Sequence, residues 1–407
     1  MSVLPPRRPD DIVLVAGLRT PFSKFGGALR HVPSVELGAE ALRRLIARSG
    51  LAAGDIDEVF YGVTLPSEVA LDGPTSGRQA LLRAGLPEGT RSLTLDRGCC
   101  SSMTAVHLAV HSLRRGDSSF VIAAGAENMG RATFLAPAGL RFGHRHGSIT
   151  LRDPLDRLGA DIGGRPVTVD VGEVALAWDV SREMQDDWAE ASHRRYFEAK
   201  AAGFYADHVV PVDLPAWKAG LDQDEMPRAD CSRAKLATLP TVYDSATITA
   251  GNSPGLDTGS AALLVTTRAR AAERGLTPLA TIMGVGSAAG PARDIAVIPG
   301  PSIVNALRAP GWSLADLDAI EVNEAFAAVP LVTARWLAGR DAGIERGLLA
   351  KMNPRGGAVA IGHPTGASGA RLVLQLALHL RARGGGRGVA AICGALGQGD
   401  AVAVIVD

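Results

Sequence analysis

The chain has 407 residues, enough for two or three domains around a large buried core. Its 42 basic side chains balance its 42 acidic ones with no marked run of either sign, which argues against a nucleic acid or a membrane surface as main partner. No apolar stretch approaches the roughly 20 residues that cross a bilayer. The first residues lack the apolar core of a secretory signal, so we expect a cytoplasmic protein.

The first recognisable unit along the chain is a helix followed by a strand. Residues 34–49 carry apolar side chains at three- and four-residue steps, which predicts an amphipathic helix. The segment EVFYG at residues 58–62 is a short apolar run, as expected for a parallel strand that is covered on both faces. This order of elements predicts an α/β fold.

A pair of adjacent cysteines, Cys99 and Cys100, follows the next strand-like stretch and Gly98. A helix is predicted from about Ser101, so both thiols lie at a helix N-terminus, which favours the thiolate form. Such a turn also lies at the carboxyl ends of the strands, where α/β sheets bind ligands. A disulfide between neighbours would be strained, and no cysteine has the spacing of a zinc ligand. Packing and nucleophilic chemistry both remain open.

Residues 126–245 contain more Asp, Trp, Tyr and His and less alternation of strands and helices. Within them, Ser181 with Glu183 in the first turn marks a helix N-terminus. We interpret residues 126–245 as an inserted, mainly helical loop domain. Strand-like sequence resumes at residue 247, so the first half is predicted to comprise residues 1–125 and 246–275.

The remainder, residues 276–407, repeats the design of the first half. A helix again leads through an Asp-Leu-Asp turn into a short apolar strand, AIEV at residues 319–322. Residues 366–399 then give a helix, a basic glycine-containing turn, an apolar strand and a glycine-rich loop, in the same order as residues 101–130. The repeat predicts two pseudo-symmetric halves.

Three polar side chains in the second half stand at strand ends or in the loops that follow. His363 lies among small residues and is either functional or a satisfied loop histidine. Cys393 ends a strand, and on its own it would be interpreted as a buried cysteine that packs in the core. Asn323 is either a site residue or a helix cap. The two-fold relation would bring His363 opposite Cys99. Cysteine and histidine supply a nucleophile and its base, and an amide can hold a water or an oxyanion, which together suit acyl transfer.

Six segments, in order along nearly the whole chain, resemble the signatures of the thiolase family, the acetyl-CoA C-acyltransferases and 3-ketoacyl-CoA thiolases. The segments are RTPFSKFGGAL, DRGCCSSMTAV, TAGNSPGLDTGSAA, EVNEAFAA, GGAVAIGHPTGASGAR and CGALGQG. The resemblance implies a five-layer αβαβα core of two pseudo-symmetric halves plus a helical loop domain. It also implies a homodimer or homotetramer that acts on acyl-CoA, acetyl-CoA and CoA, with no tightly bound cofactor and no metal.

The resemblance also assigns roles to the cysteines. Aligning Ala105 and Val106 with the family segment places Cys99 at the nucleophile position, whereas Cys100 would need a one-residue deletion. His363 would take the proton from Cys99 as it forms an acyl-enzyme. Cys393 would remove a proton from a second acyl-CoA for a Claisen condensation, or return it during thiolysis.

Further family roles fall on residues that bind oxyanions or CoA. Asn323, through a water, would form one oxyanion hole with His363, and the backbone N–H groups of Cys99 and Ala395 would form the other. The resemblance implies CoA contacts at six positions: Arg228, Ala250, Gly251, Pro254, Ala325 and Phe326.

Several positions depart from the family pattern. Pro254 replaces a serine that contacts the pantetheine arm, and Pro166 and Val167 occupy positions near the acyl pocket. The glycine triplet after the second cysteine reads Gly394-Ala395-Leu396, and Gly130 replaces a serine. We therefore expect an active enzyme whose acyl chain is not limited to acetyl. The competing hypotheses are a decarboxylating ketoacyl synthase and a non-catalytic protein that binds CoA or lipid.

Overall fold

The computed structural model describes residues 7–70, 73–156, 158 and 165–407. Its strands, in chain order, are β1 (Ile12–Arg19), β2 (Glu58–Gly62), β3 (Arg91–Leu95), β4 (Phe120–Asn128), β5 (Val212–Leu214), β6 (Ala219–Leu221), β7 (Thr258–Thr267), β8 (Ala280–Ala289), β9 (Ala319–Val322), β10 (Gly386–Cys393) and β11 (Gln398–Val406). Its α-helices are α1 (Ser34–Ser49), α2 (Ser76–Arg83), α3 (Ser101–Arg115), α4 (Val167–Ala177), α5 (Arg182–Ala201), α6 (Arg233–Ala237), α7 (Arg268–Glu273), α8 (Pro299–Arg308), α9 (Ala328–Leu337), α10 (Ala342–Lys351), α11 (Ala358–Ile361) and α12 (Thr365–Ala382).

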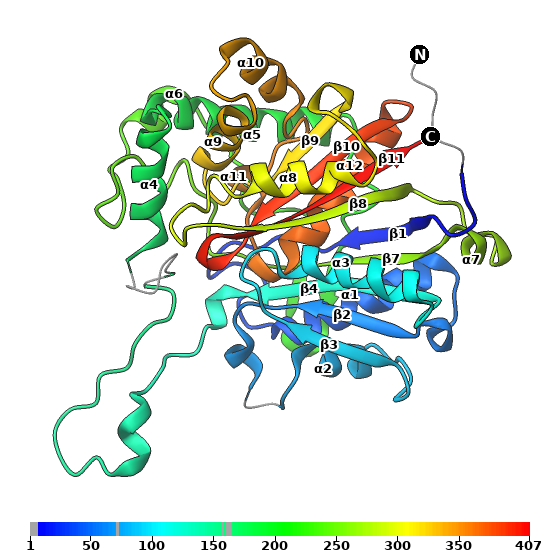
Figure 1. The fold of residues 1–407 in the computed structure, drawn as a ribbon. Coiled ribbons are helices and arrows are strands. Elements are labelled where there is room, and N and C mark those ends of the chain that lie inside the picture. Colours follow the sequence, from blue (N-terminus) through cyan, green and yellow to red (C-terminus); the bar gives the residue numbers. More distant parts are fainter. Residues whose placement is uncertain (1–6, 71–72, 157, 159–164) are drawn as a thin grey trace.

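Nine of these strands form one sheet in the order β3-β2-β4-β7-β1-β8-β11-β10-β9. Strands β1 and β8 lie at the middle of the sheet. On one side, β1–β7 and β7–β4 are antiparallel pairs and β4–β2 is a parallel pair. On the other side, β8–β11 and β11–β10 are antiparallel pairs and β10–β9 is a parallel pair. In the first half, β3 pairs in parallel with β2. At the corresponding place in the second half, beside β9, there is a parallel bridge between Ile320 and Met352. Figure 1 shows β2 to β4 on one side of β1 and β8, and β9 to β11 on the other. The predicted pseudo-symmetry is thus visible in the hydrogen-bond pattern.

Helices α3 and α12 form the central layer between the two halves. Helix α3 packs on β2 and β4 of the first half and on β11 of the second, while α12 packs on β4, β7, β9 and β10. Helices α1 and α2 cover the outer face of the first half, and α8 covers that of the second. Residues Thr365–Ala377 of α12 are buried on every side, as expected for a helix enclosed between the two halves of the nine-stranded sheet. The result is five layers of alternating helices and strands.

The chain between β4 and β7 leaves the sheet and carries α4, α5, α6 and the small β5–β6 sheet (Figure 1). Ser181 caps α5 as predicted, since its Oγ accepts a hydrogen bond from the Met184 N–H at 3.3 Å. The limits of this insertion, residues 126 and 245, stay a prediction.

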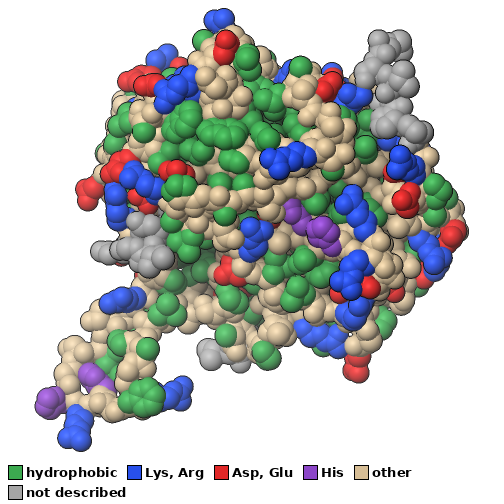
Figure 2. Space-filling model, in the orientation of Figure 1, with side chains coloured by type: hydrophobic (Ala, Val, Ile, Leu, Met, Phe, Trp, Pro, Cys, Tyr) green, Lys and Arg blue, Asp and Glu red, His purple; other side chains and the backbone are tan. Residues whose placement is uncertain are grey.

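An arm formed by residues 132–156 projects away from the rest of the molecule, at the lower left of Figure 1. Its two sides are joined by the backbone hydrogen bonds of Leu135 and Arg152. Figure 2 shows apolar and basic side chains on it, and the Phe142 side chain is 88% exposed. In the part of the chain that the structure describes, no helix is both long and apolar enough to cross a membrane.

Candidate active site

The two adjacent cysteines lie in different environments at the turn between β3 and α3. Gly98, with φ of +63°, reverses the chain before them, as glycine does without strain. The Cys100 side chain is fully buried, and its Sγ donates to the carbonyl of Arg97 at 3.1 Å. Cys99 is only half-buried. The accessible thiol of the pair is therefore that of Cys99.

The Cys99 thiol is not the activated thiolate that a helix N-terminus alone favours. Burial raises its pKa well above the ordinary value, and the nearby Cys393 thiol raises it further. The N-terminus of α3 favours the thiolate, but the loss of water around the buried sulfur outweighs that effect. Cys99 therefore keeps its proton at neutral pH and needs a base.

The turn between β10 and β11 brings the second half to the same place. A Cβ atom placed on Gly98 would lie 2.5 Å from the backbone nitrogen of Ala395, so the two turns are in direct contact. A Cβ on Gly394 would lie 2.5 Å from Cys100 Sγ. Cys393 ends β10, is buried, and has its pKa raised to about 12 by that burial. The structure thus brings Cys99, Cys393 and Ala395 together from opposite halves.

His363 precedes α12 by two residues, as Cys99 precedes α3, and these two helices pack side by side. Its Nδ1 lies 2.7 Å from Ser368 Oγ, which donates its own proton to the Pro364 carbonyl at 2.9 Å. His363 Nδ1 therefore carries the ring proton and leaves Nε2 as the basic nitrogen. Burial lowers the pKa of His363 to about 3, so the ring is neutral at physiological pH.

Asn323 directly follows β9 and does not cap a helix, because α9 begins only at Ala328. Its Nδ2 lies 3.2 Å from His363 Nε2, and its Oδ1 accepts from Arg371 Nη2 at 3.2 Å. Asn323 and Arg371 are both buried, so these contacts fix the amide in one orientation. The structure places Asn323 beside the basic nitrogen of His363.

Two buried carboxyls that the sequence reading did not single out hold the His363 loop. Asp257 Oδ2 accepts from the His363 backbone N–H at 2.7 Å. Glu127 accepts hydrogen bonds from Thr64, Leu65, Thr365 and Gly366, and so connects β4 to the start of α12. The signal available for Asp257 was its place inside the recognised segment TAGNSPGLDTGSAA, but nothing in the local sequence identified its partner.

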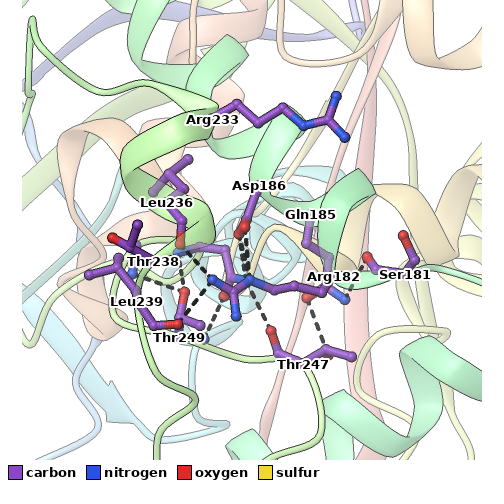
Figure 3. Close-up of polar contacts among 12 residues, drawn as sticks. Ser181, Arg182, Gln185, Asp186, Arg233, Leu236, Thr238, Leu239, Thr247 and Thr249 are labelled. Carbon is purple, nitrogen blue, oxygen red and sulfur yellow. Dashed lines mark hydrogen bonds and ion pairs between the residues drawn. The ribbon is translucent and has the colours of Figure 1, made fainter.

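The segment that contains Ala250, Gly251 and Pro254 is held by a polar network, part of which Figure 3 shows. Arg182 on α5 donates to Asp186 and to the carbonyl oxygens of Leu236 and Leu239. Asp186 in turn accepts from Asn252 Nδ2 at 3.2 Å. A Cβ atom on Gly251 would overlap the Leu236 and Leu239 side chains, so glycine lets the segment pack against this turn.

The remaining CoA candidates are spread over two elements. Ala325 and Phe326 are buried and follow Asn323 closely in the chain. The next residue, Ala327, donates its backbone N–H to the Asn252 carbonyl at 2.9 Å, which connects this stretch to the segment from Ala250 to Pro254. Arg228 is exposed on the inserted region, with its backbone N–H donating to His193 Nδ1 at 3.1 Å. Across the described residues, no group of three or more His, Cys, Asp or Glu side chains has the arrangement of a metal site.

Comparisons with known proteins agree over the length of the chain. The model for the thiolase N-terminal domain matches residues 12–269, and that for the thiolase C-terminal domain matches residues 276–406. An acetyl-CoA acetyltransferase of Pseudomonas aeruginosa is 38% identical over 98% of this chain and 100% of its own length. One from Escherichia coli is 34% identical over 97% of this chain and 98% of its own.

Solved structures give the same result. The acetyl-CoA acetyltransferase of Bacillus anthracis superposes with a TM-score of 0.89 at 32% identity, covering 97% of this chain and 98% of that one. Human mitochondrial 3-ketoacyl-CoA thiolase, solved in complex with CoA, gives 0.89 at 30% identity over 98% and 99% of the two chains. The chain therefore belongs to the thiolase family and is an acyltransferase of the class that condenses and cleaves acyl-CoA thioesters.

Proposed function

We propose that the chain cleaves and forms 3-ketoacyl-CoA through an acyl group carried on Cys99. The observation that supports this most directly is the contact between the Cys99 turn and the Cys393 turn, with His363 two residues before α12 as Cys99 is two residues before the adjacent α3. These three positions supply an accessible thiol, a second, buried thiol near the first, and a neutral histidine with Nε2 as its basic nitrogen. A nucleophile, its base and a second proton carrier are what a two-stage acyl transfer needs.

In the cleavage direction, Cys99 Sγ attacks the 3-keto carbonyl while His363 Nε2 takes its proton. The bond between the α- and β-carbons then breaks and leaves the acyl group on sulfur. The electron pair of the broken bond passes to the departing acetyl-CoA enolate, which Cys393 protonates at the α-carbon. A thiol whose pKa is raised to about 12 holds its proton in the resting enzyme and is ready for that step.

The second stage restores the enzyme. CoA gives its thiol proton to the Cys393 thiolate and attacks the acyl group on Cys99. The product acyl-CoA then leaves and Cys99 recovers its proton from His363. Condensation is the same sequence reversed, with Cys393 as the base that removes the α-proton.

Two oxyanion holes would stabilise the tetrahedral and enolate oxygens. We assign one to the N–H groups of Cys99 and Ala395, whose turns are in contact. We assign the other to His363, once protonated at Nε2, and a water held by Asn323, which lies beside that nitrogen. Losing one such donor typically costs about 3–4 kcal/mol of barrier.

The test is a thiolysis assay on a panel of 3-ketoacyl-CoAs with three single variants. Cys99→Ser and Cys393→Ser should each lower kcat by several orders of magnitude, because each removes a group that acts as a unit with its partners. Cys100→Ser is the matched control and should keep most of the activity, since serine can also donate to the Arg97 carbonyl. Equal loss in Cys99→Ser and Cys100→Ser would refute the assignment of the nucleophile.

Mass spectrometry of the protein after exposure to acetyl-CoA checks the intermediate. An acetyl group on the Cys99 peptide, absent from the Cys99→Ser variant, supports the proposal. Binding of CoA without an adduct would favour a non-catalytic protein. Release of carbon dioxide from malonyl-CoA would favour a decarboxylating synthase.

We further propose that the acyl chain is not limited to acetyl. Leu396 follows Ala395 in a left-handed conformation, with φ of +57°, and its side chain is 44% exposed at the turn between β10 and β11. Together with Pro254, Pro166 and Val167 it changes the surface where the acyl and pantetheine groups would lie. A preference for acetoacetyl-CoA over longer 3-ketoacyl-CoAs in the panel would show that these positions do not widen the substrate range.

The CoA contacts at Ala250, Gly251, Pro254, Arg228, Ala325 and Phe326, a cytoplasmic location, and a homodimer or homotetramer also remain proposals. For CoA, the supporting observation is that the Ala250–Pro254 segment and Phe326 are linked by the hydrogen bond between Asn252 and Ala327. For oligomerisation, two observations support the proposal: β3 is an exposed edge strand on which Leu93 is 46% exposed, and the arm carries exposed apolar side chains.

A further inference from the structure

A buried carboxylate in the second half of the chain holds the turn that carries Cys99. Asp400, on β11, is fully buried, and both its oxygens lie 2.9 Å from Arg97 Nη1. It also accepts hydrogen bonds from Ser287 on β8, at 2.6 Å, and from Thr104 on α3. Arg97 is two residues before Cys99, so this ion pair connects the nucleophile turn with the opposite half.

The same arginine also reaches the turn that carries Ala395. Arg97 Nε and Nη2 donate to Gln398 Oε1 at 3.3 and 3.2 Å. Gln398 Nε2 in turn donates to the Ala395 carbonyl at 3.3 Å. The planar guanidinium thus contacts a carboxylate and an amide at once, which a lysine cannot reproduce.

The backbone of Arg97 is fixed as well. Its N–H donates to Ser101 Oγ at 2.9 Å, and its carbonyl accepts from Cys100 Sγ at 3.1 Å. Ser101 Oγ also donates to the Gly98 carbonyl at 2.6 Å. Since Gly98 is in contact with the Ala395 nitrogen, the position of Arg97 sets the separation of the two turns.

We propose that Arg97 is a positioning residue for acyl transfer, which holds the N–H groups of Cys99 and Ala395 at the spacing that an oxyanion requires. This inference rests on the proposed function, because it assigns those two N–H groups to the oxyanion. The Arg97 guanidinium contacts Gln398 and Asp400, and Arg97 acts on the two N–H groups through these partners.

The experiment must separate positioning from stability, because removing one partner of a buried ion pair leaves an unpaired charge. Arg97→Met is therefore compared with the double variant Arg97→Met/Asp400→Asn. Ser287 and Thr104 donate to different oxygens of Asp400, so in the double variant the amide oxygen accepts from one hydroxyl, the amide N–H faces the other, and no unpaired charge is buried. We expect the melting temperature to fall in the single variant and to recover in large part in the double variant.

Catalysis should not recover with stability. A misplacement of about 1 Å can cost about 10²-fold in rate, so kcat should stay about 10²-fold below the native value in both variants. KM for 3-ketoacyl-CoA should change little, because the hydrogen-bond partners Gln398, Thr104 and Ser287 are not among the proposed CoA contacts. Arg97→Lys should give an intermediate kcat, since it keeps the charge near Asp400 but loses the contact with Gln398.

The matched control is Arg268→Met, which removes an arginine paired with Asp11 at 3.5 Å and of similar exposure, 22% against 26% for Arg97. It should leave kcat unchanged. Recovery of kcat together with melting temperature in the double variant would overturn the inference and leave Arg97 as a stabilising residue only. A native enzyme inactive on the whole substrate panel would instead overturn the proposed function.

Discussion

Burial keeps each of the three proton-transfer groups neutral in the resting protein. The pKa of Cys99 and that of Cys393 are raised, and the pKa of His363 is lowered. A neutral thiol beside a neutral imidazole costs less to bury than an ion pair, which would need further hydrogen bonds. Charge therefore develops only during the reaction, where oriented donors can stabilise it.

This protonation state predicts how Cys99 responds to pH. The thiolate fraction of a thiol whose pKa lies above 9 grows about tenfold for each pH unit up to that pKa. The rate of alkylation by iodoacetamide, followed on the Cys99 peptide by mass spectrometry, should therefore rise throughout pH 6–9. A plateau below pH 8 would reveal a thiolate already formed in the resting enzyme.

Asp257 gives a second prediction, on stability. Burial raises its pKa to about 7 from an ordinary 3.8, so the folded protein holds this proton more tightly than the unfolded chain. The free energy of unfolding should then fall as pH rises from about 4 to about 7, where the carboxylate forms in the fold. Asp257→Asn keeps an acceptor for the His363 N–H and removes the charge.

We expect Asp257→Asn to raise the melting temperature at pH 8 and to change it little at pH 4.5, as measured by scanning calorimetry. If the variant lowers the melting temperature at pH 8, the ionised carboxylate stabilises the His363 loop rather than straining it. Thiolysis assays of the same variant would report whether the loop keeps its position.

At the scale of elements, the contact between α3 and α12 depends on a glycine. A Cβ atom on Gly369 would clash with the backbone nitrogen and the Cβ of Met103. The neighbouring Ala370 N–H donates to Ser102 Oγ at 3.0 Å, so the two helices are joined there by a hydrogen bond as well as by packing. These helices carry Cys99 and His363 at their N-termini, and their separation sets that of the two side chains.

Gly369→Ala should therefore lower the free energy of unfolding by about 1–3 kcal/mol, the usual cost of overpacking, and should lower kcat as well. Urea denaturation and the thiolysis assay measure the two effects. Gly347→Ala in α10 is the control, because its added methyl would meet no atom within 4 Å. That substitution should be neutral or stabilise by up to about 1 kcal/mol, and equal losses in both variants would contradict the packing argument.

Local elements could be predicted from the sequence, and long-range partners could not. The strands at residues 58–62 and 319–322 and the helix cap at Ser181 follow from short patterns, and the structure has them at those positions. Arg97 and Asp400 are 303 residues apart, and neither lies in a pattern that points to the other. The raised pKa of Cys99 could not be predicted from local sequence either, since it follows from burial in the fold and from Cys393 in the other half.

At the scale of the whole molecule, the arm predicts self-association. Phe134, Leu135, Phe142, Ile149 and Leu151 are all large, apolar and about half or more exposed, and a patch of this kind on a soluble protein usually marks an interface. Light scattering coupled to gel filtration should give the mass of a dimer or tetramer of the 42.1 kDa chain.

The double variant Phe134→Ser/Phe142→Ser should lower that mass or raise the concentration needed for assembly. Leu82→Ser, at an exposed position on α2, serves as the control for loss of an apolar surface side chain. An unchanged mass in the arm variant would assign the interface to another surface, such as the edge of β3.

The order of strands has one more consequence. A protease that nicked the tip of the arm would divide the chain into a piece with β1 to β4 and a piece with everything from α4 onwards. Strand β7 of the second piece is hydrogen-bonded to β4 on one side and to β1 on the other, both from the first piece. The fragments are interleaved and should stay together: denaturing electrophoresis would show two bands where gel filtration still shows one species. The arm is thus the natural place to split the gene for fragment complementation or to insert a reporter.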